Sequence, residues 1–158
     1  KVLRGPFDCL ASCNEALRLA QIAYPNNSII LEYCGFNRPV CVIGDSDRLI
    51  QCLKNLIGNA VKYSELRSEI ALEINAQDDS VLFTVKDHGQ GIPVDQQERI
   101  FERFQRADGV TLRRGDSSSG LGLSIVKMLM EGMGGSVRVQ SEIGVGSRFI
   151  LTLQRSLS

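Results

Sequence analysis

The chain has 158 residues, of which 43% are hydrophobic and 23% are charged, and its 18 basic residues balance its 18 acidic ones. This length and composition predict one globular domain over residues 1–158, with enough apolar residues for a substantial core. A net charge of zero argues against nucleic acid or an anionic membrane surface as the main partner. No segment approaches the roughly 20 consecutive apolar residues of a membrane span.

Cysteine and histidine usage argues against both a disulfide framework and a zinc site. The five cysteines are odd in number, none forms a C-x-x-C pair, and His88 is the only histidine. The expected state is free thiols in a reducing compartment, mostly acting as small apolar residues. The cysteines are Cys9, Cys13, Cys34, Cys41 and Cys52.

The first third of the chain predicts a helix, two short strands and a second, longer helix. Residues 8–24 have apolar residues at helical spacing, and Asp8 stands where an N-cap is expected. Residues 28–34 and 40–43 are rich in Ile, Leu and Val and predict strands. Residues 46–63 predict the long helix.

The rest of the chain predicts two hairpins separated by helices and a long loop. Each hairpin consists of two alternating apolar and polar runs joined by a polar or Gly-containing turn. The predicted elements are strands 69–76 and 80–86, a short helix over 94–104, a helix over 121–133 that ends at two glycines, and strands 136–141 and 147–153. The apolar side of the helix predicted over 121–133 comprises Leu121, Ile125, Met128 and Leu129.

This order of elements predicts an α+β fold. Adjacent strands with interspersed helices favour a two-layer sandwich, in which three helices cover one face of a mixed, mostly antiparallel sheet. Residues 105–119 have no apolar period and are rich in Gly, Ser, Asp and Arg. Long loops inside compact domains are usually functional, so we expect a flexible lid there.

The helix predicted over residues 46–63 has two distinct faces. Its polar face contains two amides rather than the usual mixture of Glu and Lys. Such a stripe can be an ordinary solvated face, or it can be the floor of a ligand site in which amide oxygens suit Mg²⁺ and a lysine neutralises phosphate. The apolar face comprises Leu49, Leu53, Leu56, Ile57 and Ala60, and the polar face comprises Arg48, Gln51, Asn55, Asn59 and Lys62.

The stretch "DHGQGIP" follows an apolar strand directly. Asp87 would be costly at that place unless exposed or paired, and a carboxylate suits an exocyclic amine such as that of adenine. Gly89 and Gly91 would let a flat ring approach the backbone, and Ile92 would add an apolar wall. A tight turn without a ligand remains the alternative. His88 has no metal or triad partner in the sequence and is interpreted as a bystander.

A second glycine pair, Gly120 and Gly122, stands where the long loop becomes a helix. A helix N-terminus attracts phosphate, but a ligand-free glycine-rich helix start is the alternative. The spacing matches neither a P-loop nor a dinucleotide fingerprint.

Taken in order, these motifs resemble the ATP-binding catalytic domain of two-component sensor histidine kinases, in the superfamily shared with DNA gyrase B, Hsp90 and MutL. "DRLIQCLKNLIGNAVKYS" is similar to the N box of that family, "VKDHGQGIP" to its G1 box, "IFERFQRAD" to its F box and "SSGLGLSIV" to its G2 box. The tail "GGSVRVQSEIGVGSRFILTL" resembles its closing hairpin. The match covers nearly the whole chain.

The resemblance implies the cofactors ATP and Mg²⁺ and a set of site residues. Asn59 would bind the metal, Asn55 would support the metal or its water shell, and Lys62 would contact phosphate, so these three form the implied catalytic set. The other implied ATP-binding residues are Tyr63, Asp87, Gly89, Gly91, Ile92, Phe104, Arg106, Ser119, Gly120, Leu121, Gly122 and Leu123.

Several of the implied roles have equally weighted alternatives. Phe101 and Phe104 would anchor the base of the lid or simply pack in the core. Arg103 and Arg106 would reach phosphate or the lid, or remain surface charges. For the lid residues Arg113 and Arg114, solvated charge is the stronger interpretation of either one alone. Ser118 replaces a glycine that is usual in the family, which puts the geometry of the lid in doubt.

The function implied is transfer of the γ-phosphate of ATP to a histidine on upstream dimerisation helices, with a response regulator as the further partner. The chain lacks an H-E phosphoacceptor motif, so that histidine lies outside it. A serine kinase of the superfamily is one alternative. A non-catalytic docking module is another, but the competent residue types at all the ligand-facing positions argue against it. An ATP-driven clamp is disfavoured because Asn55 stands where such clamps have a glutamate base. The expected location is the cytoplasm, without direct membrane contact by this fragment, and membrane anchoring of the full-length protein stays open.

Overall fold

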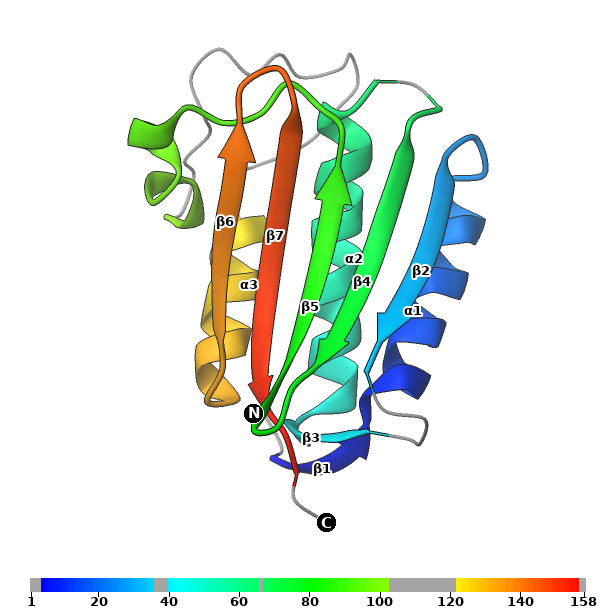
Figure 1. The fold of residues 1–158 in the computed structure, drawn as a ribbon, viewed down its shortest axis with the longest axis vertical. Coiled ribbons are helices and arrows are strands. Elements are labelled where there is room, and N and C mark those ends of the chain that lie inside the picture. The colour runs from blue at the N-terminus through cyan, green and yellow to red at the C-terminus, as the bar shows by residue number, and fades with distance from the viewer. Residues whose placement is uncertain (1–3, 36–39, 66, 103–121, 157–158) are drawn as a thin grey trace.

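The computed structural model of the chain describes residues 4–35, 40–65, 67–102 and 122–156. Three α-helices cover one face of a five-stranded sheet, and the other face of the sheet is open (Figure 1). The strand order is β2-β4-β5-β7-β6, in which only β2 and β4 pair in parallel. The predicted α+β sandwich with a mixed, mostly antiparallel sheet is therefore confirmed.

The main elements agree closely with the predicted ranges. The helices are α1 (Cys9–Ala23), α2 (Ser46–Tyr63) and α3 (Gly122–Gly132), and the strands are β2 (Ser28–Cys34), β4 (Glu69–Ala76), β5 (Ser80–Asp87), β6 (Ser136–Glu142) and β7 (Gly146–Gln154). Asp8 caps α1 as predicted, because its Oδ1 accepts hydrogen bonds from the backbone N–H groups of Leu10 and Ala11. Asp45 caps α2 in the same way.

A second, two-stranded sheet was not evident in the sequence. The strand β1 (Gly5–Asp8) pairs antiparallel with β3 (Cys41–Gly44), the strand predicted over 40–43. Sequence patterns predict no strand at β1, since four residues are too few to show alternation and Pro6 lowers the strand propensity of the segment. This small sheet lies at the end of the molecule where the chain enters α1 (Figure 1).

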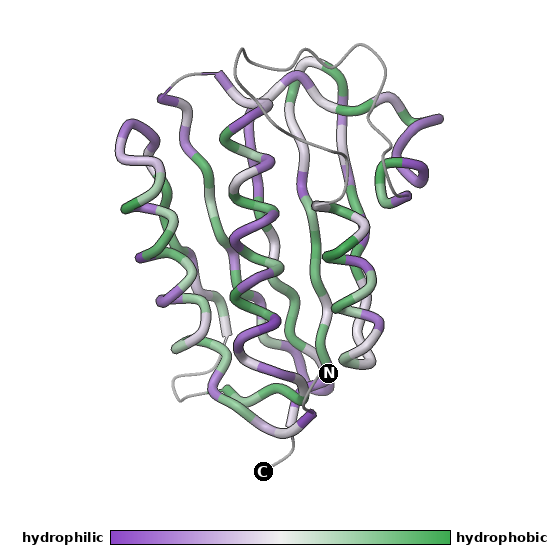
Figure 2. Tube along the Cα trace, turned by 180° about the vertical axis from the view of Figure 1, so that it is seen from behind, coloured by the Kyte–Doolittle hydropathy of each residue, from purple (hydrophilic) through white to green (hydrophobic). Residues whose placement is uncertain are grey.

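The apolar face of α2 is packed against the sheet, as predicted. All five residues of that face are at most 3% exposed, and the facing residues of β4 and β5 are equally buried. Figure 2, which looks onto the helices, shows hydrophilic and hydrophobic segments alternating along α2. The sheet residues beneath the helix are Ile70, Leu72, Ile74, Val81, Phe83 and Val85.

Two predictions about the segments on either side of the lid were wrong. A short helix was expected over 94–104, but the described part of that range, 94–102, contains two 3₁₀ turns, η1 (Val94–Gln96) and η2 (Arg99–Phe101). Met128 was expected on the core side of α3 but is 62% exposed. The buried residues of α3 are Val126, Leu129 and Met130, which centres the inner face of the helix on the side opposite Met128. The lid predicted over 105–119 lies outside the described residues.

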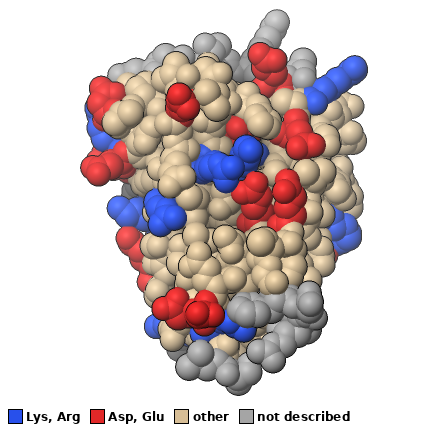
Figure 3. All heavy atoms as spheres, in the orientation of Figure 1, with Lys and Arg blue, Asp and Glu red and all other residues tan. Residues whose placement is uncertain are grey.

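The open face of the sheet carries charged groups of both signs (Figure 3). Arg148 of β7 reaches across β5 to Glu73 of β4, with an Nη1–Oε1 distance of 2.9 Å. None of the helices in the described part of the chain combines the length and apolar character needed to span a bilayer.

Candidate functional site

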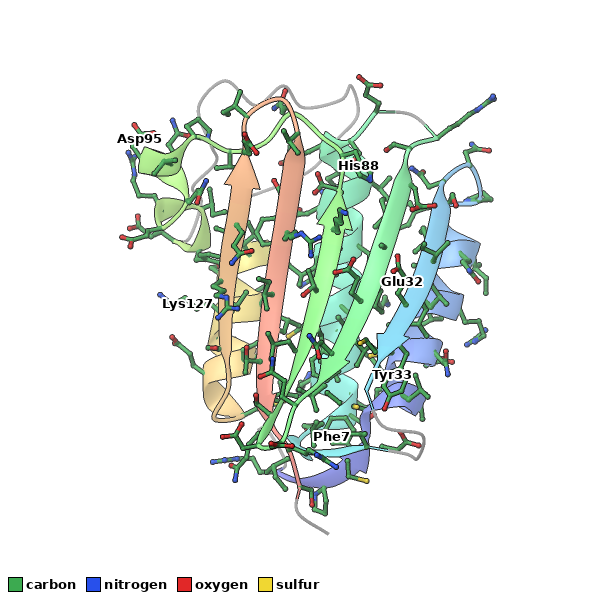
Figure 4. All side chains as sticks on the ribbon, viewed as in Figure 1. Phe7, Glu32, Tyr33, His88, Asp95 and Lys127 are labelled. Atoms are coloured by element: carbon green, nitrogen blue, oxygen red, sulfur yellow. The ribbon has the colours of Figure 1, made fainter. Side chains whose placement is uncertain are left out.

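Several of the segments that carry the predicted site residues meet at one end of the sandwich. The C-terminal end of α2, the end of β5 and the β6–β7 turn lie together at the top of Figure 1, with the N-terminus of α3 below them. His88 marks the point where β5 ends (Figure 4). Residues that are far apart in the sequence are thereby brought together around Asp87.

Asp87 is the last residue of β5 and is only 7% exposed. Strand alternation places its side chain on the same face as Val85 and Phe83, which is the face covered by the helices. Its Oδ1 accepts hydrogen bonds from the backbone N–H of Gly89 at 2.8 Å and of Ser147 at 3.3 Å. No described residue donates to Oδ2, so this oxygen is available to a ligand.

Burial raises the pKa of Asp87 above its ordinary value. The two backbone hydrogen bonds and the neighbouring His88 act in the opposite direction but do not outweigh the loss of hydration. A buried carboxylate with a raised pKa is typical of functional sites. A tight turn alone accounts for Oδ1 of Asp87, which accepts from the N–H of Gly89 two residues on, but it gives Oδ2 no donor among the described residues.

The glycines of this loop are required by the protein itself. A Cβ on Gly89 would lie 2.5 Å from the carbonyl oxygen of Tyr63, because the loop lies directly against the end of α2. Gly91 has a φ of 81°, and a Cβ there would collide with the carbonyl oxygen of Glu142 in β6. The sequence interpretation assigned these glycines to the approach of a ligand. The structure shows that close backbone packing requires them.

The polar stripe of α2 divides into two parts. In the first half of the helix, Arg48 Nη1 donates a hydrogen bond to Gln51 Oε1 at 3.1 Å. In the second half, Asn55, Asn59 and Lys62 are each half-buried. No hydrogen bond or ion pair joins these three side chains to any other described residue. The side chains of the first half are therefore paired with each other, and the second half offers unengaged polar groups.

The second half of the stripe has the donor chemistry that Mg²⁺ requires. Amide oxygens such as those of Asn55 and Asn59 are neutral, hard ligands, and Mg²⁺ is commonly bound through few protein groups plus substrate phosphates and water. Within residues 4–35, 40–65, 67–102 and 122–156, no cluster of three or more His, Cys, Asp or Glu side chains offers another metal site.

The structure describes the remaining predicted residues only in part. Ile92 and Tyr63 border the loop that follows Asp87, and both are half-buried. Gly122 is the first residue of α3, and a Cβ there would meet no described atom within 4 Å; Leu123 packs partly against the core. Phe104, Arg106, Ser119, Gly120 and Leu121 lie outside the described residues, as do Arg103, Arg113, Arg114 and Ser118.

Phe101 is described and packs as an ordinary aromatic contact. Its ring meets that of Phe149 edge to face, with centroids 6.2 Å apart and an interplanar angle of 80°. This contact places η2 on β7. Whether Phe101 also anchors the base of the lid stays a prediction, since residues 103–121 lie outside the described residues.

The sequence interpretation missed three polar residues around the loop of Asp87. Ser147 donates its N–H to Asp87, Ser141 accepts a hydrogen bond from Ile92, and Gln97 donates to the carbonyl oxygen of Ile92. The partners are 5 to 60 positions apart in the chain. Such pairs depend on strand register, which a single sequence does not reveal.

The fold is that of a known class of ATPases and kinases. Residues 44–157 match the family model described as histidine kinase-, DNA gyrase B-, and HSP90-like ATPase. The match includes every site residue predicted above. The chain belongs to this family.

The similar proteins include a sensor protein, a sensor histidine kinase and a protein whose structure contains AMPPNP. The chain is 40% identical over 111 residues to the sensor protein SrrB of Staphylococcus aureus, which covers 70% of this chain and 19% of SrrB. It superposes on the mycobacterial sensor histidine kinase MprB with a TM-score of 0.81 and 25% identity, covering 97% of this chain and 98% of that one. The structure of full-length ShkA in complex with AMPPNP gives a TM-score of 0.81 and 30% identity, covering all of this chain and 33% of ShkA.

Proposed function

We propose that the chain binds Mg·ATP and transfers its γ-phosphate to a histidine on a helical phosphotransfer domain that lies outside these residues. The observation that carries this proposal is the meeting of two complementary groups at one end of the sheet. One is a buried carboxylate with an oxygen available to a base, and the other is a helix face with amides and a lysine available to phosphate and metal.

The base end of the site selects adenine through the charge of Asp87. The exocyclic amine of adenine donates to Oδ2, while Oδ1 stays bound to Gly89 and Ser147. Guanine presents a carbonyl oxygen at the equivalent ring position, and this oxygen would face the carboxylate without a hydrogen. Ile92 adds an apolar wall beside the ring.

The phosphate end of the site is the second half of the α2 stripe. Lys62 neutralises phosphate charge, Asn59 would hold Mg²⁺, and Asn55 would bind the metal or its water shell. The metal supplies charge neutralisation on the phosphates. Phosphoryl transfer depends mainly on positioning and charge stabilisation, so these groups suffice when the imidazole of the acceptor histidine is the nucleophile.

The alternative of an ATP-hydrolysing clamp has less support. Water attack needs a general base, and an amide such as that of Asn55 takes no proton at neutral pH. The polar stripe of α2 contains no carboxylate. A serine kinase would use the same nucleotide site with an acceptor on another protein, so the identity of the acceptor residue distinguishes it from a histidine kinase.

The partners proposed for the chain follow from its relatives. The chain spans about a fifth of the length of SrrB. We infer that residues 1–158 act as one catalytic unit, that dimerisation helices of the same protein carry the acceptor histidine, and that a response regulator receives the phosphate. The proposed location is the cytoplasm.

The test is nucleotide titration followed by phosphotransfer. We expect calorimetry to show ATP binding that tightens with Mg²⁺. With ATP labelled at the γ-phosphate, we expect an acid-labile, base-stable phosphohistidine on a phosphotransfer helix pair added in trans, and no label on His88 of the chain alone. Acid-stable phosphoserine on the acceptor would favour the serine kinase, and rapid phosphate release without acceptor would favour the clamp.

A further inference from the structure

Ile92 has both of its backbone polar groups held by side chains from other parts of the fold. Its N–H donates to Ser141 Oγ of β6 at 2.8 Å. Its carbonyl oxygen accepts from Nε2 of Gln97, which lies between η1 and η2, at 3.0 Å. The same Nε2 also donates to the carbonyl oxygen of Ser141 at 3.1 Å. The two side chains therefore bind both backbone polar groups of Ile92.

The hydrogen bonds of Ser141 connect this segment to Asp87. Ser141 Oγ donates to the carbonyl oxygen of Gly146 at 3.0 Å and lies 2.8 Å from Ser147 Oγ. Because the Ser141 proton goes to Gly146, the hydroxyl of Ser147 is the donor between the two serines. The N–H of Ser147 in turn donates to Asp87 Oδ1. The network thus links the carboxylate of Asp87 to Ile92, the two residues that would contact the adenine base.

We propose that Ser141 and Gln97 are positioning residues that set the distance between Asp87 and Ile92, and hence the width of the slot for the adenine ring. They act through Ile92 and Ser147 and need not touch the nucleotide. This inference rests on the proposed function, in which Asp87 and Ile92 bind the base.

The loop has other contacts that keep it folded without these two side chains. Gly91 packs against the carbonyl oxygen of Glu142, and the N–H of Gly144 donates to the carbonyl oxygen of Gln90 at 2.9 Å. Both contacts join the loop to the β6–β7 hairpin through backbone atoms alone. Ser141 and Gln97 therefore add local orientation to a loop that is already anchored.

The test uses Ser141→Ala and Gln97→Leu in the complete chain, with Ser136→Ala and Gln140→Leu as matched controls. Both control residues are exposed on β6, the strand that contains Ser141, and take no part in the network. Each variant is titrated with ATP, ADP and GTP, with and without Mg²⁺. Circular dichroism melting confirms that each variant is folded.

We expect each test variant to lose roughly 5- to 20-fold in affinity for ATP, since one or two hydrogen bonds orient the segment. ADP should lose the same factor, and the Mg²⁺-dependent gain should be unchanged, because the defect lies at the base end. GTP affinity should change little, so the ratio of ATP affinity to GTP affinity should decrease. Ser141→Thr, which retains the hydroxyl, should restore most of the affinity and the exchange protection of the Ile92 amide.

The outcomes distinguish a failure of the proposed function from a failure of the positioning roles. If the unmodified chain binds no ATP, the proposed function is wrong and the positioning roles are overturned with it. If it binds ATP but both test variants match their controls, or lose ATP and GTP affinity equally, only the positioning roles are overturned. Should Ser141→Ala not fold, Gln97→Leu decides the question by the same comparison.

Discussion

The two ends of the candidate site are organised differently. At the base end, Asp87 is buried and already holds two backbone hydrogen bonds, and the loop after it is bonded to β6 and to the η1–η2 segment. At the phosphate end, Asn55, Asn59 and Lys62 are half-buried and bonded to no described residue. The proposed base pocket is thus built by the protein in advance, whereas the proposed phosphate floor presents groups that would acquire their geometry when phosphate and metal bind.

The largest effect is expected from Asp87→Asn. The amide oxygen can still accept from Gly89 and Ser147, so the fold should survive, but the other position becomes an N–H₂ group facing the amine of adenine. We expect ATP affinity to fall roughly 100-fold, since a charge-assisted hydrogen bond is replaced by two opposed donors. Calorimetry measures the effect. Asp78→Asn, in the exposed β4–β5 turn, is the control and should bind ATP normally.

Asn59→Ala should separate the two ends of the site. We expect about a tenfold loss of ATP affinity in the presence of Mg²⁺, with little change in EDTA, because the base pocket stays intact. Gln51→Ala is the matched control on the same stripe, since the side chain of Gln51 is already hydrogen-bonded to Arg48. Equal responses of the two variants to EDTA would contradict the division of the stripe.

The pH dependence of binding reports on Asp87 directly. Because burial raises the pKa of its carboxyl group, this group protonates at a higher pH than an ordinary aspartate, and ATP affinity should fall as the pH drops through that raised value. Below the raised pKa of Asp87, ATP affinity should fall by about tenfold per pH unit. Subtracting the profile of Asp87→Asn removes the titration of the nucleotide phosphates. His88→Gln removes a charge that lowers the pKa of Asp87, so it should move the loss to higher pH.

The raised pKa of Asp87 also affects folding stability. This effect favours low pH, whereas ATP binding favours high pH. The folded chain holds the Asp87 proton more tightly than the unfolded chain, so this group contributes stability below the ordinary pKa and loses it as the pH rises through the folded value. Asp87→Asn should abolish that part of the pH dependence of unfolding by urea. An unchanged pH profile would argue that Asp87 is better hydrated than its 7% exposure indicates.

The smallest effects concern glycines whose roles differ. Gly89→Ala should lower the free energy of unfolding by about 1–3 kcal/mol, because its Cβ would press on the carbonyl oxygen of Tyr63. Gly122→Ala should be neutral or stabilising by about 0.5 kcal/mol, since its Cβ meets no described atom. Thermal melts measure both. A loss of ATP affinity in the stable Gly122→Ala variant would support close approach of phosphate there.

Local sequence patterns predicted most of the fold. Alternation predicted both long hairpins, and helical spacing predicted which side of α2 is buried, since each signal repeats several times within one element. The patterns failed at three short elements, whereas β3, also of four residues, was predicted from its apolar residues rather than from a period. The strand β1 and the turns η1 and η2 have three or four residues each, so neither period has room to appear. On α3, the inward direction depended on which neighbours the helix packs against.

The sequence by itself determined the residue types at the site: an aspartate at the end of an apolar strand, amides and a lysine on one helical stripe, and glycines in the loop between them. Only the tertiary structure decided which of these groups the protein already engages. It joined Arg48 to Gln51 and left Asn55 and Asn59 without a partner among the described residues, and it bonded one oxygen of Asp87 to a strand 60 residues away. The physical reason is that a hydrogen bond between distant segments depends on register and packing, whereas the composition of a helix face depends only on its own residues.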